Sequence, residues 1–408
     1  YETLKGNPSF CRYLVTLVSN SEYLSEILIR DPGLFDVFGS GDALDTEPTR
    51  EELDSELAIL SRAVDAEAAP YRLRDSETLR IGMRELFREI SVIEVGRELT
   101  LVAEVCLDYA LERARRDVEQ KCGPTQGAFA ILGLGKFGGR EMGYGSDLDL
   151  VYVYEAEAVI ESGMAASEYF AAVAAKVIQR LKEFTRYGSL YDIDARLRPD
   201  GKKGTLAVSD RRLFEYYEQE AQVWELLALI KARAVSGDLS FREMIERRVR
   251  EMAFSADLNA EHLAQIEDIQ QRIAQGVPPS HLKKATGGLV ELEFAVRLLQ
   301  LQHAASCPDL RRSDVMGALD ILADMGGLSS WDFSVLRDAY LLYRRVENRI
   351  RMMQGRSESH IPEDADARNE LAHRLGLERD LADLVQGHQQ AVHGVYKSVV
   401  RAAKARAM

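Results

Sequence analysis

Two aspartates, Asp147 and Asp149, stand two positions apart in a segment rich in β-branched and aromatic residues, which predicts a strand. Side chains alternate between the two faces of a strand, so both carboxylates point the same way. Two neighbouring carboxylates repel each other unless a cation or a group of donors compensates them. Hard oxygen ligands at this spacing suit Mg²⁺, which binds carboxylates, water and substrate phosphates. An isolated Asp-x-Asp pair is nevertheless more often a solvated strand face.

A second segment, at residues 190–197, repeats this logic, because charged and apolar residues alternate along it. It predicts a strand whose charged face carries Asp192, Asp194, Arg196 and, just beyond it, Arg198. A carboxylate from this strand would complete a two-metal site for in-line phosphoryl or nucleotidyl transfer. The two arginines would neutralise charge on phosphoryl oxygens, or pair with Asp192 or Asp194, and the two interpretations are compatible.

A glycine-rich turn, Gly-Leu-Gly-Lys-Phe-Gly-Gly at 133–139, precedes the Asp-x-Asp strand. Such a turn supplies backbone N–H groups and lets a phosphate approach closely, with Lys136 as a point charge. It lacks the Gly-Lys-Ser/Thr of a Walker A motif. It has the bare spacing of a dinucleotide fingerprint, but the next strand carries Asp-x-Asp instead of a single ribose-binding acid. An ordinary tight turn is the alternative, and the order of turn, acidic strand, helix and second acidic strand favours phosphate chemistry.

The elements around these motifs predict an α+β fold that is mostly helical. Apolar spacing predicts helices from Ser9 to about Asp117, with Asp75 and Ser76 as the N-cap of one of them. Short apolar runs predict strands at 128–132, 147–154, 190–197 and 205–208, and from about Leu213 the chain reads as helical to its end. We therefore expect a small mixed sheet flanked by helices, divided as 1–120 (N-terminal helical region), 121–236 (catalytic core) and 237–408 (C-terminal helical bundle).

Composition narrows the class of protein. The 408 residues suggest two to three domains at roughly 150 residues each. A formal charge of −14 disfavours a protein that neutralises nucleic-acid phosphates, and the sequence contains no long apolar run typical of a membrane span. Four scattered cysteines without a CxxC pair disfavour a zinc or disulfide framework and fit a cytoplasmic protein. A start at Tyr1 instead of Met suggests one part of a longer chain.

The order of glycine turn, Asp-x-Asp strand and later aspartate resembles the DNA polymerase β-type nucleotidyltransferase core. The amino-acid sequence supports a more specific resemblance. Several long motifs resemble those of the glutamine synthetase adenylyltransferase family, and the resemblance covers nearly the whole chain. These motifs occupy residues 133–150, 190–199, 224–225 with 231–233, and 284–294.

The resemblance implies a role for each candidate residue. Asp147 and Asp149 would bind two Mg²⁺ ions that hold the triphosphate of ATP, and Asp194 would hold the catalytic metal and orient or deprotonate the attacking tyrosine hydroxyl. A phenol with a pKa of about 10 needs such help at neutral pH. The predicted phosphate contacts are Gly138, Gly139, Ser146, Lys136, Arg196 and Arg198.

Members of the family carry two such cores in tandem, one that adenylylates a tyrosine of glutamine synthetase and one that removes the AMP by phosphorolysis. This chain holds one core. Its wording is more similar to the adenylylating half, although Gly145 stands where that half has Ser. The resemblance implies glutamine synthetase as protein substrate, and the PII signal protein and glutamine as regulators of the full-length enzyme. The alternatives are the deadenylylating half and a catalytically silent binding module.

Glu291 and Glu293 form a further acidic pair on a predicted helix. We interpret the helix as structural, with Glu293 paired to Arg297 one turn later on a solvated face. A direct active-site role for either glutamate is the alternative.

Overall fold

The computed structural model describes residues 8–34, 44–63, 66–87, 90–255, 258–355 and 359–407. These residues form two compact units. The first contains the described residues of 1–213, 234–245 and 351–357, and the second contains those of 214–233, 246–350 and 358–408. The first unit therefore unites the N-terminal helices with the sheet. The three-part division of the chain made from the sequence stays a prediction.

The helices that precede the sheet confirm the predicted N-terminal helical region. They are α2 (Pro8–Asn20), α3 (Glu22–Arg30), α4 (Arg50–Ala63), α5 (Ala69–Phe87) and α6 (Val92–Cys122). Ser21 caps α3 by accepting a hydrogen bond from the N–H of Leu24, and Ser91 with Glu94 forms a capping box at the start of α6. The predicted cap at Asp75 is wrong. This residue lies in the middle of α5, buried and paired with Arg74, because the helix already begins at Ala69.

The sheet and its connections follow in the order expected from the sequence, with one addition. Their bounds are β1 (Phe129–Gly133), α7 (Gly135–Gly138), β2 (Leu148–Tyr154), α8 (Ala166–Lys182), β3 (Ile193–Asp194), a 3₁₀ turn η3 (Gly201–Lys203), β4 (Ala207–Ser209) and β5 (Arg233–Gly237). The addition is β5, which corrects the expectation of an all-helical chain beyond Leu213. It contains a single β-branched residue, so its pairing in the sheet, rather than local propensity, accounts for it.

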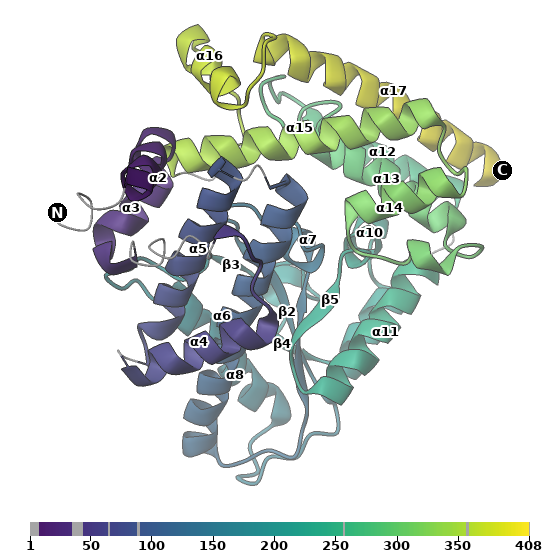
Figure 1. The fold of residues 1–408 in the computed structure, drawn as a ribbon. Coiled ribbons are helices and arrows are strands. Elements are labelled where there is room, and N and C mark those ends of the chain that lie inside the picture. The colour runs from purple at the N-terminus through teal and green to yellow at the C-terminus, as the bar shows by residue number, and fades with distance from the viewer. Residues whose placement is uncertain are drawn as a thin grey trace. The chain divides into compact units, whose positions relative to one another are not determined.

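Strand β2 is the centre of the five-stranded sheet, whose order is β3-β2-β1-β5. Its residues 150–154 pair antiparallel with the whole of β1. On its other edge it pairs in parallel with β3 at its beginning and with β4 at its end. Helix α8 packs against β3 and β4 and against α6, which in turn contacts α5 (Figure 1). This confirms the mixed sheet and the α+β, mostly helical class.

The predicted strand at 190–197 is much shorter than expected, because β3 contains only two residues. The side chain of Asp194 accepts a hydrogen bond from the backbone N–H of Arg196 at 2.9 Å. This local bond from an aspartate to the residue two positions later turns the chain and competes with the strand ladder. The alternation of side chains therefore ends at Asp194, and Arg196 and Arg198 lie in the following turn.

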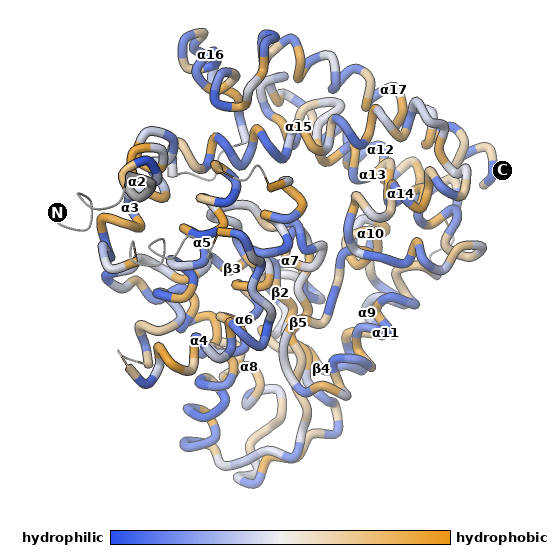
Figure 2. The backbone as a smooth tube through the Cα atoms, in the orientation of Figure 1, coloured by the Kyte–Doolittle hydropathy of each residue, from blue (hydrophilic) through white to orange (hydrophobic). Residues whose placement is uncertain are grey.

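The core of the first unit lies around the sheet. β1 is buried over its full length, and Phe129 stacks on Tyr152 of β2 and on Phe170 of α8. Figure 2 shows hydrophobic and hydrophilic stretches alternating along the surrounding helices, as expected for helices with one buried face.

The remaining helices complete the chain. They are α9 (Asp210–Gln219), α10 (Val223–Leu229), α11 (Leu239–Ser255), α12 (Ala260–Ala274), α13 (Leu289–His303), a 3₁₀ turn η4 (Pro308–Leu310), α14 (Val315–Asp324), α15 (Ser330–Gln354), α16 (Ala365–Arg374) and α17 (Leu381–Ala407). Within the second unit α13 packs against α14 and α17, and α17 also contacts α12 and α16. In the described parts of the chain, no helix is both long and apolar enough to cross a bilayer.

Candidate active site

The start of β2 forms an acidic edge with its neighbour β3; we use this name for Asp147, Asp149 and Asp194. The register of the parallel pair places Asp149 directly opposite Asp194. Asp147 is exposed and lies one residue before β2, and Leu148 between the two aspartates is fully buried. The structure thus brings the three predicted carboxylates to one edge of the sheet, as the two acidic segments suggested.

The glycine turn closes against Asp149. The backbone N–H of Leu134 donates to the carbonyl oxygen of Asp149 at 2.9 Å. Gly135 has a φ of +55°, and a Cβ built on it would lie 2.2 Å from Oδ2 of Asp149. Any side chain at this position would be strained and would displace the carboxylate, so glycine is required here for two independent reasons.

Arg196 supplies the positive charge at the acidic edge. Its Nε lies 2.9 Å and 2.8 Å from the two carboxylate oxygens of Asp194. The hydrogen bond from Arg196 lowers the pKa of Asp194, although partial burial opposes this effect. In return Asp194 raises the pKa of Arg196, and the charges of Asp149 and Asp147 raise it further. The guanidinium of Arg196 therefore feels the charge of all three carboxylates, and Lys202 adds a second positive charge that lowers the pKa of Asp194.

Arg198 is engaged elsewhere. Its Nε donates to the carbonyl oxygen of Thr205 at 2.9 Å and its Nη2 donates to that of Gly204 at 3.2 Å, while Nη1 donates to Ala195. These bonds fasten the turn that follows β3. In this structure the guanidinium holds backbone carbonyls, and its predicted contact with phosphate stays a prediction.

The predicted phosphate contacts in the glycine turn are also engaged with the protein. The N–H of Gly138 donates to the carbonyl of Leu134 at 2.9 Å, and the N–H of Gly139 donates to that of Gly135 at 3.1 Å. Lys136 is half-buried in α7. The turn thus uses the Gly138 and Gly139 amides to close itself, which is the ordinary role that the sequence left open.

Ser146 immediately precedes the acidic edge and is only 6% exposed. Its Oγ accepts hydrogen bonds from the N–H of Gly143 at 2.9 Å and from Nη1 of Arg351 at 3.2 Å. Gly145 supports the same turn with a φ of +60°, which explains glycine where the resemblance led us to expect serine. The hydroxyl therefore fixes the loop, and its contact with phosphate stays a prediction.

The acidic edge fits a divalent cation by the chemistry of its donors. Mg²⁺ binds carboxylate oxygens, and the edge offers those of three aspartates, all of which act on the guanidinium of Arg196. Within the described segments, no three His, Cys, Asp or Glu side chains are gathered closely enough to hold one metal ion. Asp194 is paired with Arg196, so a cation bound by all three carboxylates requires Arg196 to release Asp194.

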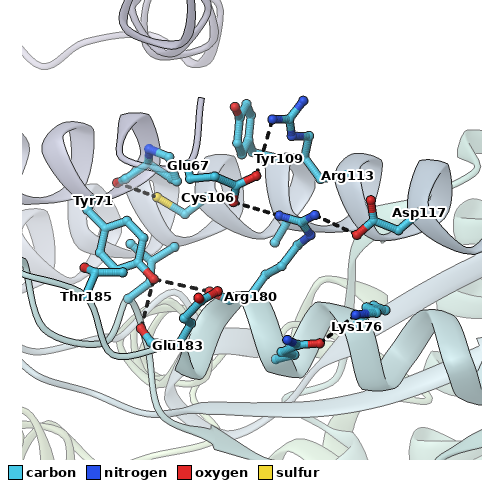
Figure 3. A pocket seen from close by; sticks show the side chains of 14 residues that line it. Glu67, Tyr71, Cys106, Tyr109, Arg113, Asp117, Lys176, Arg180, Glu183 and Thr185 are labelled. Atoms are coloured by element: carbon cyan, nitrogen blue, oxygen red, sulfur yellow. Dashed lines mark hydrogen bonds and ion pairs between the residues drawn. The ribbon is translucent and has the colours of Figure 1, made fainter. Parts of the chain in front are cut away.

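A separate cavity of about 280 Å³ lies between α5, α6 and α8 (Figure 3). Its charged groups pair with one another, since Arg180 bridges Glu67 at 2.9 Å and Asp117 at 2.6 Å. Burial raises the pKa of the Cys106 thiol to about 12, so this cysteine is not reactive. The cavity contains none of the predicted site residues.

The glutamate pair of α13 lies in the second unit. Glu291 is fully buried and accepts from Nδ1 of His393, 2.7 Å away, and from the N–H of Gly287. Glu293 lies 3.1 Å from Nζ of Lys231 and 2.9 Å from Arg297. The pair with Arg297 is thus confirmed, but it is partly buried and not on a solvated face as expected.

Comparison with known proteins identifies the family. The sequence model described as glutamate-ammonia ligase adenylyltransferase matches residues 11–248, more than half of the chain, and this match includes the whole acidic edge. The chain belongs to the glutamate-ammonia ligase adenylyltransferase family. Since glutamate-ammonia ligase is another name for glutamine synthetase, the resemblance found in the sequence motifs is confirmed. A second model, described as PII-uridylyltransferase, matches residues 260–403.

Relatives named bifunctional glutamine synthetase adenylyltransferase/adenylyl-removing enzyme are similar over most of the chain. Those of Mycobacterium tuberculosis strain H37Rv and Mycobacterium avium strain 104 are 31% and 30% identical over 93% of this chain, which covers 39% of each relative. The relative from Stenotrophomonas maltophilia strain K279a is 32% identical over 89% of this chain and is covered to 40%. The chain therefore spans about two fifths of the family members it matches.

The sequence analysis missed two residues that hold segments next to the acidic edge. Arg351, from the last turn of α15, reaches the loop before Asp147, and Arg74 of α5 holds the segment before β3. Arg74 lies next to Asp75 in a helical stretch, and Arg351 lies about 200 residues from the carboxylates. No local signal in the sequence marks either one, because the segments that they hold are brought to them by tertiary packing.

Proposed function

We propose that this chain is one catalytic half of a bifunctional enzyme and transfers AMP from ATP to a tyrosine hydroxyl of glutamine synthetase. The observation that carries the proposal is the acidic edge, in which Asp149 lies opposite Asp194 and Asp147 stands two residues before Asp149 on β2. Membership of the family supports the type of reaction, and the names of the relatives support glutamine synthetase as the substrate.

The reaction forms one bond and breaks one. The tyrosine oxygen bonds to the α-phosphorus of ATP, and the bond from that phosphorus to the oxygen bridging to the β-phosphate breaks. Pyrophosphate leaves with the electron pair, and the phenolic proton is lost to a carboxylate or to water. At neutral pH the phenol needs a base or a neighbouring cation, since its ordinary pKa is about 10.

The residues of this chain have distinct tasks in the proposal. Asp147 and Asp149 would hold the triphosphate end of ATP through Mg²⁺, and Asp194 would orient the tyrosine hydroxyl. Bound Mg²⁺ would supply neutralisation of the negative charge that develops on the phosphoryl oxygens. Hydrogen bonding to Arg196 lowers the pKa of Asp194, so this carboxylate is ionised at neutral pH and able to accept a proton or ligate a cation. Arg196, once released from Asp194, is placed to face the phosphates.

The choice of the adenylylating half rests on the amino-acid sequence of two motifs. The segments 141–149 and 194–199 are more similar to that half, whereas the removing half more usually has Asn-Phe before its first aspartates and Met after the third. The removing half would use inorganic phosphate and AMP-tyrosine at the same acidic edge. The PII signal protein and glutamine are proposed as regulators of the longer enzyme, and the match to a PII-uridylyltransferase model supports a link to that signalling system.

The test is to incubate the chain with Mg²⁺, α-labelled ATP and unmodified glutamine synthetase, and to follow label on the synthetase. Stable label supports the adenylylating half. Absence of label, with release of ADP from adenylylated synthetase after phosphate is added, assigns the deadenylylating half. If neither reaction occurs and nucleotide does not bind, the catalytic proposal is wrong and the binding module is left.

A further inference from the structure

Arg351 holds the loop that leads into Asp147. It lies in the last turn of α15, within the first unit, and is 6% exposed. Its Nη1 donates to the carbonyl oxygen of Tyr144 at 3.0 Å and to Oγ of Ser146 at 3.2 Å. Ser146 also donates its N–H to the carbonyl of Gly143 at 3.1 Å. The four-residue loop is therefore closed on itself and fastened to α15 directly before the first catalytic carboxylate.

The last turn of α15 is itself fastened on a second side. Oγ of Ser21, a buried residue, donates to the carbonyl oxygen of Met352 at 2.8 Å. Ser21 is also the N-cap of α3. The residue next to Arg351 is thus hydrogen-bonded to the start of a second helix, which limits how far the guanidinium can move with its backbone.

Arg74 does the same for the other acidic strand. Its Nη1 donates to the carbonyls of Ser189 and Leu190, at 2.7 Å and 2.9 Å, and its Nη2 donates to that of Tyr187 at 3.2 Å. Its Nε donates to Asp75 at 2.8 Å. These bonds fix the segment that ends three residues before β3, where Asp194 begins its pairing with Asp149.

The charges of Arg74 and Arg351 act on a common residue, Tyr23. A cavity of about 210 Å³ is lined by the loop before Asp147, by the segment before β3, by Arg74 and by Tyr23. Burial raises the pKa of the Tyr23 phenol, while the charges of Arg74 and Arg351 both oppose that rise. The charges of both guanidinium groups therefore act on the phenol of Tyr23, and Arg74 also lines the cavity.

We propose that Arg74 and Arg351 are positioning residues that preorganise the carboxylates of Asp194 and Asp147 for a divalent cation. This inference rests on the proposed function. Asp147 and Asp149 repel each other, so their backbone must be held in place for both to face one cation. Outer groups that orient ligands typically contribute 10–100-fold to metal affinity. Arginine suits the task because its five N–H donors are spread over a rigid planar fork and reach carbonyls at separate positions, whereas the three donors of lysine share one nitrogen.

The experiment measures Mn²⁺ binding in the presence of ATP by electron paramagnetic resonance, on the full chain, with thermal unfolding alongside. The variants are Arg351→Met and Arg74→Met. The matched control is Arg368→Met, because Nη1 of Arg368 also donates to two loop carbonyls, those of Pro362 and Glu363, in the second unit. We expect each site variant to bind Mn²⁺ about 10-fold more weakly, with the control unchanged. AMP transfer should show a raised Mg²⁺ requirement in the same variants.

Equal losses of thermal stability in all three variants, with unchanged Mn²⁺ affinity, would show that the arginines serve only the fold. If a methionine variant does not fold, Arg351→Lys and Arg74→Lys replace it, since each keeps the charge and one hydrogen bond. These variants should fold and still bind Mn²⁺ more weakly than the unmodified chain. Wild-type Mn²⁺ affinity in them would overturn the proposal. The outcome is separate from that of the proposed function. An unmodified chain that neither binds Mn²⁺-ATP nor transfers AMP refutes the function, whereas normal binding and transfer in the variants refute only the positioning.

Discussion

Two acid-Leu-acid triplets of the chain, Asp147-Leu-Asp149 and Glu291-Leu-Glu293, are used by the fold in opposite ways. In both the central leucine is fully buried. On a strand, positions i and i+2 share a face, so the aspartates stay together at an edge, where both charges act on the guanidinium of Arg196. On a helix, the same positions diverge by about 200°. Glu291 therefore meets His393, and Glu293 meets a separate group of cations.

The two triplets also differ in how their charged side chains are partnered. Around Glu293 the cations outnumber the carboxylates, because Lys231, Arg297 and Arg344 face Glu293 and Glu347. Each carboxylate there has a fixed partner, so the pair has no capacity for a further cation. The acidic edge differs in that it lies at the start of a strand, where Asp147 is exposed and Asp194 is paired with Arg196. An acidic pair enclosed in a network of ion pairs therefore indicates a structural role, whereas a pair at an exposed strand end is accessible to a cation.

The largest effect is expected for Asp149→Asn. The substitution removes a proposed ligand from the acidic edge, so the rate of AMP transfer should fall by about 1,000-fold or more. The free energy of unfolding should change by less than about 1 kcal/mol, because one of two repelling charges is lost. Asp192→Asn is the matched control. Asp192 is exposed and keeps its backbone bond from Leu148, so transfer should be unchanged. Full activity in a folded Asp149→Asn protein would contradict the site assignment.

Glu293→Gln tests the other triplet. It leaves three cations without their shared carboxylate, and the free energy of unfolding of the second unit should fall by roughly 3 kcal/mol, as when one partner of a buried ion pair is removed. Urea denaturation measures this, with Asp268→Asn, which removes an exposed i,i+4 partner of Arg272, as the control expected to cost less than about 0.5 kcal/mol. A neutral effect at Glu293 would mean that the network is not structural.

The stability difference between the unmodified chain and Glu293→Gln should depend on pH. Burial alone would raise the pKa of Glu293, but Lys231, Arg297 and Arg344 lower it to about 2, from an ordinary value of 4.5. A carboxylate with a depressed pKa stabilises the folded state fully above its unfolded value and loses this contribution as the pH falls through the folded value. The difference should be constant above about pH 5 and shrink between pH 4.5 and 2. A difference that grows on acidification would contradict the assignment.

The smallest effect on stability is expected when a chelator removes Mg²⁺. Mg²⁺ is expected to arrive largely with the nucleotide, so a chelator should stop AMP transfer but leave the melting temperature within about 1 °C. Differential scanning calorimetry of the chain without nucleotide, before and after chelation, provides the measurement. A large drop in melting temperature would indicate a structural ion and would remove the contrast between the two triplets.

Sequence patterns predicted β1, β2 and the positions of the three aspartates well, because alternation and apolar runs are local signals. They failed at β3, where the side chain of Asp194 turns the backbone at Arg196 instead of letting the strand continue. Asp75 was taken for a helix cap, since nothing nearby shows that Arg74 would pair with it inside α5. Partners brought together only by tertiary packing, such as Arg351 with Tyr144, leave no trace in local spacing.

The pairing of Arg196 with Asp194 occupies the carboxylate that a cation would bind in the proposed site. A guanidinium tethered two residues away is present at the carboxylate at an effective concentration of about millimolar or more. In the proposed function a divalent cation would therefore compete with a ligand that cannot diffuse away, and a cation that arrives alone would gain little. One that arrives with a triphosphate would offer the displaced guanidinium a new anion. The exchange would then favour the metal-nucleotide complex over the bare ion.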